Sequence, residues 1–147
     1  MSGIQGRRRV GRSVGALFAG VLTGVVLSLG TDMLLRAGGI LPPLGQYMSA
    51  GLFLLATAYR TVYGVAGSYV AARLAPSRPM AHAMWLGVLG MAVCILGAAA
   101  TWNKGPEFGP HWYPLALVAL ALPQSWAGGK LGELQHPESQ QIQPEGI

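Results

Sequence analysis

The sequence predicts an all-α fold, a bundle of four transmembrane helices with both termini in the cytoplasm. The first observation is composition: of 147 residues only 10% are charged, 52% are hydrophobic, and the mean hydropathy is +0.43. A soluble domain carries about 25% charged residues, so this chain has too few to cover a solvated surface. The same shortage excludes a disordered chain. A single cysteine excludes an internal disulfide framework and a cysteine-rich metal site.

The second observation is the spacing of the charges. Uncharged runs of 19, 23, 25 and 22 residues follow Arg12, Arg36, Arg78 and Glu107. About 20 apolar residues cross the hydrocarbon core of a bilayer as a helix, which satisfies its own backbone. We therefore expect spans at residues 14–35, 47–74, 80–101 and 112–131. Together they form one domain over residues 1–132, followed by a disordered tail over residues 133–147.

Each span has recognisable flanks. The run in span 14–35 is longer than the apolar region of a signal peptide and no cleavage site follows it, so we interpret it as a retained helix. One Gly-Gly pair and one Pro-Pro pair in residues 37–46 end that helix before span 47–74 begins. A proline-bounded turn at residues 75–79 and a Gly-Pro-rich loop at residues 102–111 precede the last two spans.

Basic residues predict the orientation, because short cytoplasmic loops carry an excess of Lys and Arg. With a cytoplasmic N-terminus, seven basic residues lie inside: Arg7, Arg8, Arg9, Arg12, Arg73, Arg78 and Lys130. Only Arg36 and Lys104 lie outside. The net charge of +5 then reflects topology and anionic headgroups of the lipid bilayer. We expect no nucleic acid partner, since the basic residues form no continuous stripe.

Two ionisable residues fall within or at the edge of spans, Asp32 and Arg60. A charge at mid-bilayer costs about 2.5–3.5 kcal/mol on insertion scales, so each needs a partner. Both lie in rows of small residues that recur every four positions, a spacing that permits close helix packing. The packing positions of these rows are Gly20, Gly24, Ser28, Gly64 and Ser68. We expect spans 14–35 and 47–74 to form a close hairpin in which Asp32 and Arg60 pair.

Two alternatives remain for this pair. In one, Asp32 reaches interfacial water while Arg60 binds backbone carbonyls or a partner chain. In the other, Arg60 lines a water-filled cavity and binds an anionic solute or lipid headgroup, with hydroxyls from Tyr59 and Tyr63. An intramembrane ionisable group is a functional candidate, but a structural ion pair satisfies the same chemistry.

The remaining chemistry-bearing residues are scattered. His82 and His111 lie on opposite sides of the predicted membrane and cannot share a metal, while His136 belongs to the tail. Cys94 is interpreted as a packing residue, and Pro123 as a helix kink. The aromatic residues Trp102, Phe108, Trp112 and Tyr113 form an outer interfacial belt. No nucleophile, paired carboxylate or phosphate loop is visible, so we expect no enzyme, no cofactor and no metal.

Three short segments resemble those of small bacterial four-helix membrane proteins that carry no assigned activity: Gly30-Thr31-Asp32, residues 75–82 and Trp112-Tyr113-Pro114. The resemblance implies a multi-pass protein of the bacterial inner membrane. We expect it to act without catalysis, as a homo-oligomer or a small subunit of a larger membrane complex, through close helix packing. The alternative is a small transporter or channel that uses the Arg/Asp pair.

Overall fold

The structure is a computed structural model that describes residues 2–135. It contains four α-helices and one 3₁₀ turn, and the described residues form no strand: α1 (Ser2–Ala37), α2 (Ala50–Leu74), α3 (Pro79–Thr101), η1 (Pro106–Phe108) and α4 (Trp112–Leu134). The predicted all-helical class and helix number are therefore confirmed. Of the predicted tail, residues 136–147 lie outside the described part of the chain.

The helix ends differ from the predicted spans where polar sequence continues a helix. α1 begins at Ser2 rather than near residue 14, because arginine is a good helix former and no proline interrupts the basic segment. α2 begins at Ala50 rather than Tyr47, since Ser49 has extended backbone angles at the N-cap position. α4 continues to Leu134, two residues beyond the predicted domain boundary.

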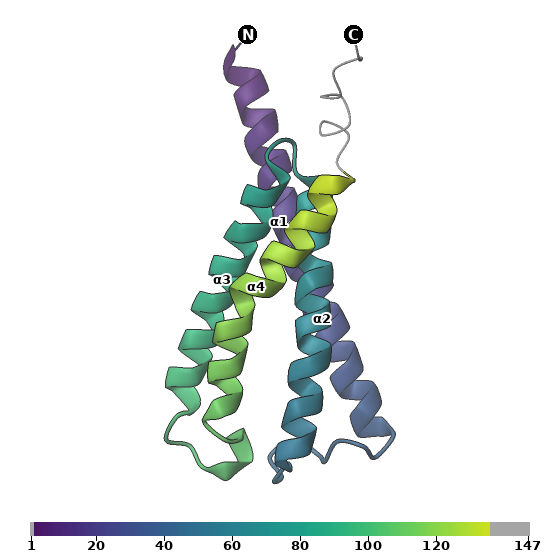
Figure 1. Ribbon diagram of the computed structural model, residues 1–147, viewed down its shortest axis with the longest axis vertical. Coiled ribbons are helices and arrows are strands. Elements are labelled where there is room, and N and C mark those ends of the chain that lie inside the picture. Colours follow the sequence, from purple (N-terminus) through teal and green to yellow (C-terminus); the bar gives the residue numbers. More distant parts are fainter. Residues whose placement is uncertain (1, 136–147) are drawn as a thin grey trace, which may run out of the picture.

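Short connections fix the order of the helices in space. Arg78 adopts a left-handed conformation (φ 49°) and Pro79 occupies the first turn of α3, so the chain reverses tightly after α2. The N-terminal end of α1, this turn and the C-terminal end of α4 lie at one end of the bundle (Figure 1). The α1–α2 and α3–α4 loops lie at the other end, as an up-and-down arrangement requires.

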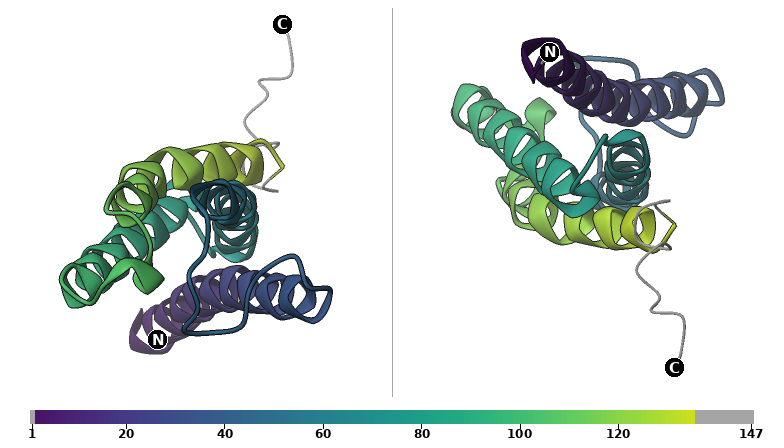
Figure 2. Two further views of the ribbon diagram at one scale, coloured as in Figure 1. Left: turned by 90° about the horizontal axis from the view of Figure 1, so that it is seen from below. Right: turned by 90° about the horizontal axis from the view of Figure 1, so that it is seen from above.

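α2 is the central helix. It packs against α1 and α4 along much of its length and also contacts α3, whereas α4 packs against both α2 and α3. α1 contacts α3 only sparsely, and the end-on views in Figure 2 show α1 on the opposite side of α2 from α4. The bundle is thus closed along α2, α3 and α4 and more open between α1 and α3.

The interior consists of small residues. The buried apolar side chains are mainly alanines, for example Ala71, Ala72 and Ala83, and the large apolar side chains face outward, among them Phe18, Leu34 and Leu96. A monomeric soluble protein rarely exposes so continuous an apolar surface. Small residues at helix interfaces are instead typical of helices that associate in lipid.

Length and composition identify two helices able to cross a membrane, Gly3–Ala37 and Pro79–Thr101. The predicted spans on α2 and α4 do not meet this criterion. α2 carries Arg60 and Arg73 together with several hydroxyl groups, and α4 carries Gln124, Lys130 and Glu133, so the mean hydropathy of both helices is lower. By length and composition, the described residues therefore contain two candidate spans, on α1 and α3, whereas α2 and α4 are more polar.

Candidate functional site

Two glycines bring α1 and α2 into backbone contact. A Cβ atom added to Gly20 would lie 2.7 Å from the carbonyl oxygen of Gly67, and one added to Gly67 would lie 2.6 Å from that of Gly20. One turn along α1, a Cβ on Gly24 would lie 3.8 Å from the carbonyl oxygen of Tyr63. The two helices are therefore closest at Gly20 and slightly separated at Gly24.

The expected packing partners on α2 require a correction. Gly64 and Ser68 face α4 rather than α1: the Gln124 side chain covers Gly64, and Ser68 Oγ lies 3.1 Å from Ser125 Oγ in a buried hydrogen bond. A row of residues spaced by four slants around a helix, so its later members turn away from the first neighbour. The residues that meet Gly20 are Gly67 and Ala71, three positions further along α2.

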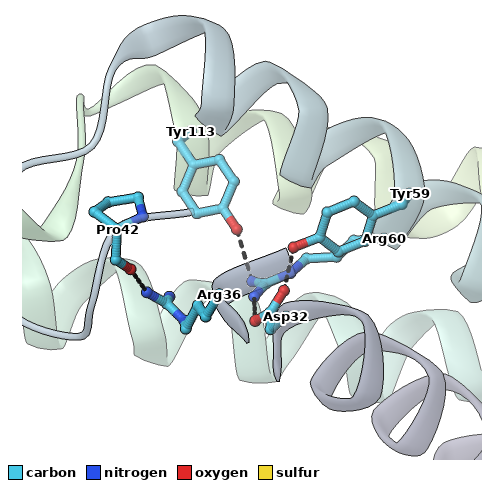
Figure 3. Close-up of polar contacts among 6 residues, drawn as sticks. All are labelled: Asp32, Arg36, Pro42, Tyr59, Arg60 and Tyr113. Atoms are coloured by element: carbon cyan, nitrogen blue, oxygen red, sulfur yellow. Dashed lines mark hydrogen bonds and ion pairs between the residues drawn. The ribbon is translucent and has the colours of Figure 1, made fainter. Parts of the chain in front are cut away.

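Asp32 and Arg60 form an ion pair between α1 and α2 (Figure 3). Nη2 of Arg60 donates to Oδ2 of Asp32 at 2.6 Å, and the side chains are 33% and 14% exposed, respectively. The pairing that the sequence predicts is thus present. The late start of α2 brings the two depths closer: Arg60 lies ten residues from Ala50 and Asp32 five from Ala37, about 15 and 8 Å along their helices, and the long arginine side chain covers the difference.

Two tyrosines complete the cluster. The hydroxyl of Tyr59 donates to Oδ1 of Asp32, so the carboxylate accepts a hydrogen bond at each oxygen. Nη1 of Arg60 donates to the hydroxyl oxygen of Tyr113 at 2.6 Å, and this tyrosine comes from α4. The guanidinium carbon also lies 6.0 Å from the centroid of the Tyr113 ring, at the outer limit of a cation–π contact. The charge pair therefore connects three helices.

The sequence analysis did not identify Tyr113 as part of this cluster. We assigned it to an interfacial belt, but its ring is half-buried and packs against Phe53 of α2, with ring centroids 4.8 Å apart. A signal was available: Tyr113 shares a row of four-residue spacing with Ala121, Ser125 and Gly129, which face the interior. We read such rows on the first two spans and not on the fourth.

Tyr63 and Ser28 lie beside the charge pair and make no contact with it. The hydroxyls of Tyr63 and Thr31 lie 2.8 Å apart, in a second polar link between α2 and α1. Tyr63, Ser28 and Arg60 all line one cavity of about 450 Å³. The alternative in which Arg60 borders a cavity is therefore compatible with the ion pair.

The cavity has walls from all four helices and is open to the surface. Along α1 it extends from Gly20 to Leu29, and along α3 from Leu86 to Cys94. Its polar groups, other than Arg60, are few: Ser28, Tyr63, Ser68, Cys94, Gln124 and Ser125. A mostly apolar hollow of about 300–1,000 Å³ with a few polar groups is typical of a small-molecule site.

The other candidates are not brought together. His82 bonds the carbonyl of Arg78 at the start of α3, and His111 bonds the carbonyl of Trp102 and stacks on its ring at the opposite end of the bundle. Among residues 2–135, no group of three His, Cys, Asp or Glu residues could hold a metal. His136 lies outside the described residues, and α4 continues as one helix through Pro123.

Comparisons with known proteins add no likeness to this geometry: no protein-family model, no curated protein and no solved structure matches the chain. The function therefore has to be argued from the cluster, the packing and the cavity.

Proposed function

We propose that all four helices cross a membrane and that both termini lie in the cytoplasm. Two helices have the length and composition of spans. α2 packs against both of them and α4 packs against α3, and Arg60, the charge nearest the middle of α2, is paired with Asp32. Pairing lowers the cost of a charge in hydrocarbon, so α2 can cross although its mean hydropathy is lower.

The orientation rests on the distribution of basic residues. One end of the bundle carries the N-terminal arginines of α1, the turn with Arg78 and the C-terminal part of α4, which includes Lys130 (Figure 1). The other end carries Arg36 and Lys104. The positive-inside rule assigns the first end to the cytoplasm. The resemblance to small bacterial membrane proteins favours the inner membrane of a bacterium as the location.

Within that membrane we assign the chain a non-enzymatic role, as a homo-oligomer or a small subunit of a larger membrane complex. The observation that carries this proposal is the surface of α1, where large apolar side chains such as Phe18 and Leu34 are exposed beside glycines at which an added Cβ atom would meet no other helix. Gly15 and Gly30 have such open space around the position of a Cβ atom. Such exposed small residues permit a second helix to approach closely in lipid.

Chemical crosslinking of the membrane-embedded chain tests this role. Cysteines that replace Gly15 and Gly30 one at a time are expected to crosslink into defined dimers in native membranes. A cysteine that replaces the buried Ala16 of the same helix serves as the matched control and is expected not to crosslink. Only monomers at all positions, together with a monomeric mass in lipid nanodiscs and no co-purifying subunit, would contradict the proposal.

The alternative role, transport of an anionic solute, has one observation in its favour, which is that Arg60 lines the cavity. Asp32 neutralises the charge of this arginine at 2.6 Å, so an anion would have to displace a carboxylate. The pair therefore supports anion binding less well than it supports a structural role. The cavity itself suits a ligand other than an anion.

A further inference from the structure

We propose that the cavity bordered by Arg60 binds an uncharged, largely apolar molecule through a carbonyl oxygen that accepts a hydrogen bond from the Arg60 guanidinium. This inference goes beyond the proposed helix-packing role. It requires membrane insertion but not an oligomer.

The electrostatics of the cluster favour an uncharged ligand. The positive charge of Arg60 is balanced by Asp32, and both carboxylate oxygens already accept a hydrogen bond. The guanidinium nevertheless has five N–H donors, of which one bonds Asp32 and one bonds Tyr113. Its Nε has no acceptor among the described residues but is itself buried, so the donors left for a ligand are the second N–H groups of Nη1 and Nη2. The cluster therefore offers hydrogen-bond donors without net charge, which suits a carbonyl better than a carboxylate or phosphate.

The position of the cavity favours a molecule that is dissolved in the hydrocarbon. Arg60 lies about 15 Å along α2 from Ala50, and along this helix the cavity extends from Arg60 to Ser68. A charged headgroup at the membrane surface would not reach this depth. A molecule with an ester or ketone group inside the hydrocarbon layer would.

The size and access favour a small ligand over a helix of another chain. The α1 wall from Gly20 to Leu29 and the α3 wall from Leu86 to Cys94 are each about 12–14 Å long, whereas a transmembrane helix is about 30 Å long. Exposed apolar residues of both walls, such as Val25 and Val93, lie on the rim. Since α1 and α3 contact each other only sparsely, the ligand enters from lipid between these two helices.

Two glycines of α3 provide a matched pair for the test. Gly90 lines the cavity and Gly97 does not, and a Cβ atom added at either position would meet no atom within 4 Å. Gly90→Phe therefore fills the cavity without a clash at the backbone, and Gly97→Phe adds the same side chain outside it. Arg60→Lys retains a cation for Asp32 and removes the planar set of donors.

The experiment uses the full chain in lipid nanodiscs and a diazirine-bearing methyl laurate as the photoreactive probe, with adducts located by mass spectrometry. We expect adducts on the wall segments of α1 and α3, loss of these adducts in Gly90→Phe, unchanged adducts in Gly97→Phe, and labelling about tenfold weaker in Arg60→Lys. Unlabelled methyl laurate should compete, whereas dodecane and laurate should compete weakly.

Equal labelling of the two phenylalanine variants would overturn the site. Competition by dodecane as strong as that by methyl laurate would overturn the carbonyl contact, and stronger competition by laurate would show an anion site instead. Alkaline extraction of the same membranes measures insertion separately, so failure of the membrane assignment is distinguishable from failure of this inference.

Discussion

Removal of the Arg60 side chain should destabilise the bundle through Asp32. In Arg60→Ala, Asp32 keeps its hydrogen bond from Tyr59 but loses the cation at 2.6 Å, and it is 14% exposed. Breaking a buried ion pair on one side costs about 3–5 kcal/mol. Because Arg60 is one third exposed, solvent or lipid headgroups screen part of this interaction, and we expect a loss of about 2–3 kcal/mol.

A double-mutant cycle isolates the pair from the separate effects of each residue. Asp32→Asn alone removes the charge but keeps one amide oxygen as an acceptor for Arg60, while its NH2 group can donate to the Tyr59 hydroxyl, so we expect a loss of about 1–2 kcal/mol. The same substitution in Arg60→Ala should cost close to nothing, because the cation that made the carboxylate favourable is gone. The expected coupling is therefore about 1–2 kcal/mol, within the range of contacting residues. Unfolding by sodium dodecyl sulfate in mixed micelles, followed by tryptophan fluorescence, measures all four free energies.

Arg36→Ala supplies the control for the loss of an arginine as such. Arg36 belongs to α1, the helix of Asp32, and its guanidinium donates to the carbonyl of Pro42 in the α1–α2 loop. Among the described residues no ion pair joins Arg36 to a carboxylate, so the coupling of Arg36→Ala to Asp32→Asn should stay below about 0.5 kcal/mol, the size of an interaction between residues four apart on a helix. If the losses of stability for Arg60→Ala and Asp32→Asn were fully additive, the ion pair would contribute no coupling free energy to the fold, and the reasoning would be refuted.

Three further predictions test the packing, the cluster and the topology. Gly20→Ala should destabilise the chain by about 1–3 kcal/mol in the same assay, because its Cβ meets the backbone of α2, whereas Gly15→Ala, in open space, should stabilise α1 by about 0.5–1 kcal/mol. Tyr113→Phe should cost about 1.5–3 kcal/mol through the lost acceptor of a charged donor. In a cysteine-free background, an impermeant maleimide added outside cells should label Asn103→Cys and leave Ser77→Cys unlabelled; the reverse would invert the topology.

The uncharged runs of the sequence predicted the ends of a helix well where the run and the helix have nearly the same bounds. α3 begins one residue before its predicted span, and α2 ends at Leu74 as predicted. α1 was predicted poorly at its start, because hydropathy marks where lipid begins and not where backbone hydrogen bonding begins. Ser49 has the opposite effect on α2, where apolar residues before the cap remain outside the helix.

The site was predictable as a pair and not as a cluster. Asp32 and Arg60 were detectable because a charge within a long apolar run demands a partner. The role of Tyr113 required knowledge of which helix lies on the second side of α2, and a sequence pattern gives the spacing of a face without the identity of its neighbour. For the same reason, Gly64 and Ser68 of α2 were predicted to pack against α1, whereas they pack against α4; their small size was correctly interpreted as a packing feature.

The cavity follows from the way α1 is attached to the rest of the bundle. α1 contacts the rest of the bundle at two points. Near Gly20 its backbone touches that of α2, and Leu86 of α3 also approaches. About 18 Å further along the helix, Asp32 forms the ion pair with Arg60 of α2. The α1 wall of the cavity, Gly20 to Leu29, lies between these two contacts. A straight helix held at both points cannot move toward α3 to close the hollow without breaking one of them. The ion pair is therefore one of the contacts that hold α1 away from α3 along the cavity, together with the Thr31–Tyr63 hydrogen bond beside it, and it borders the cavity through Arg60.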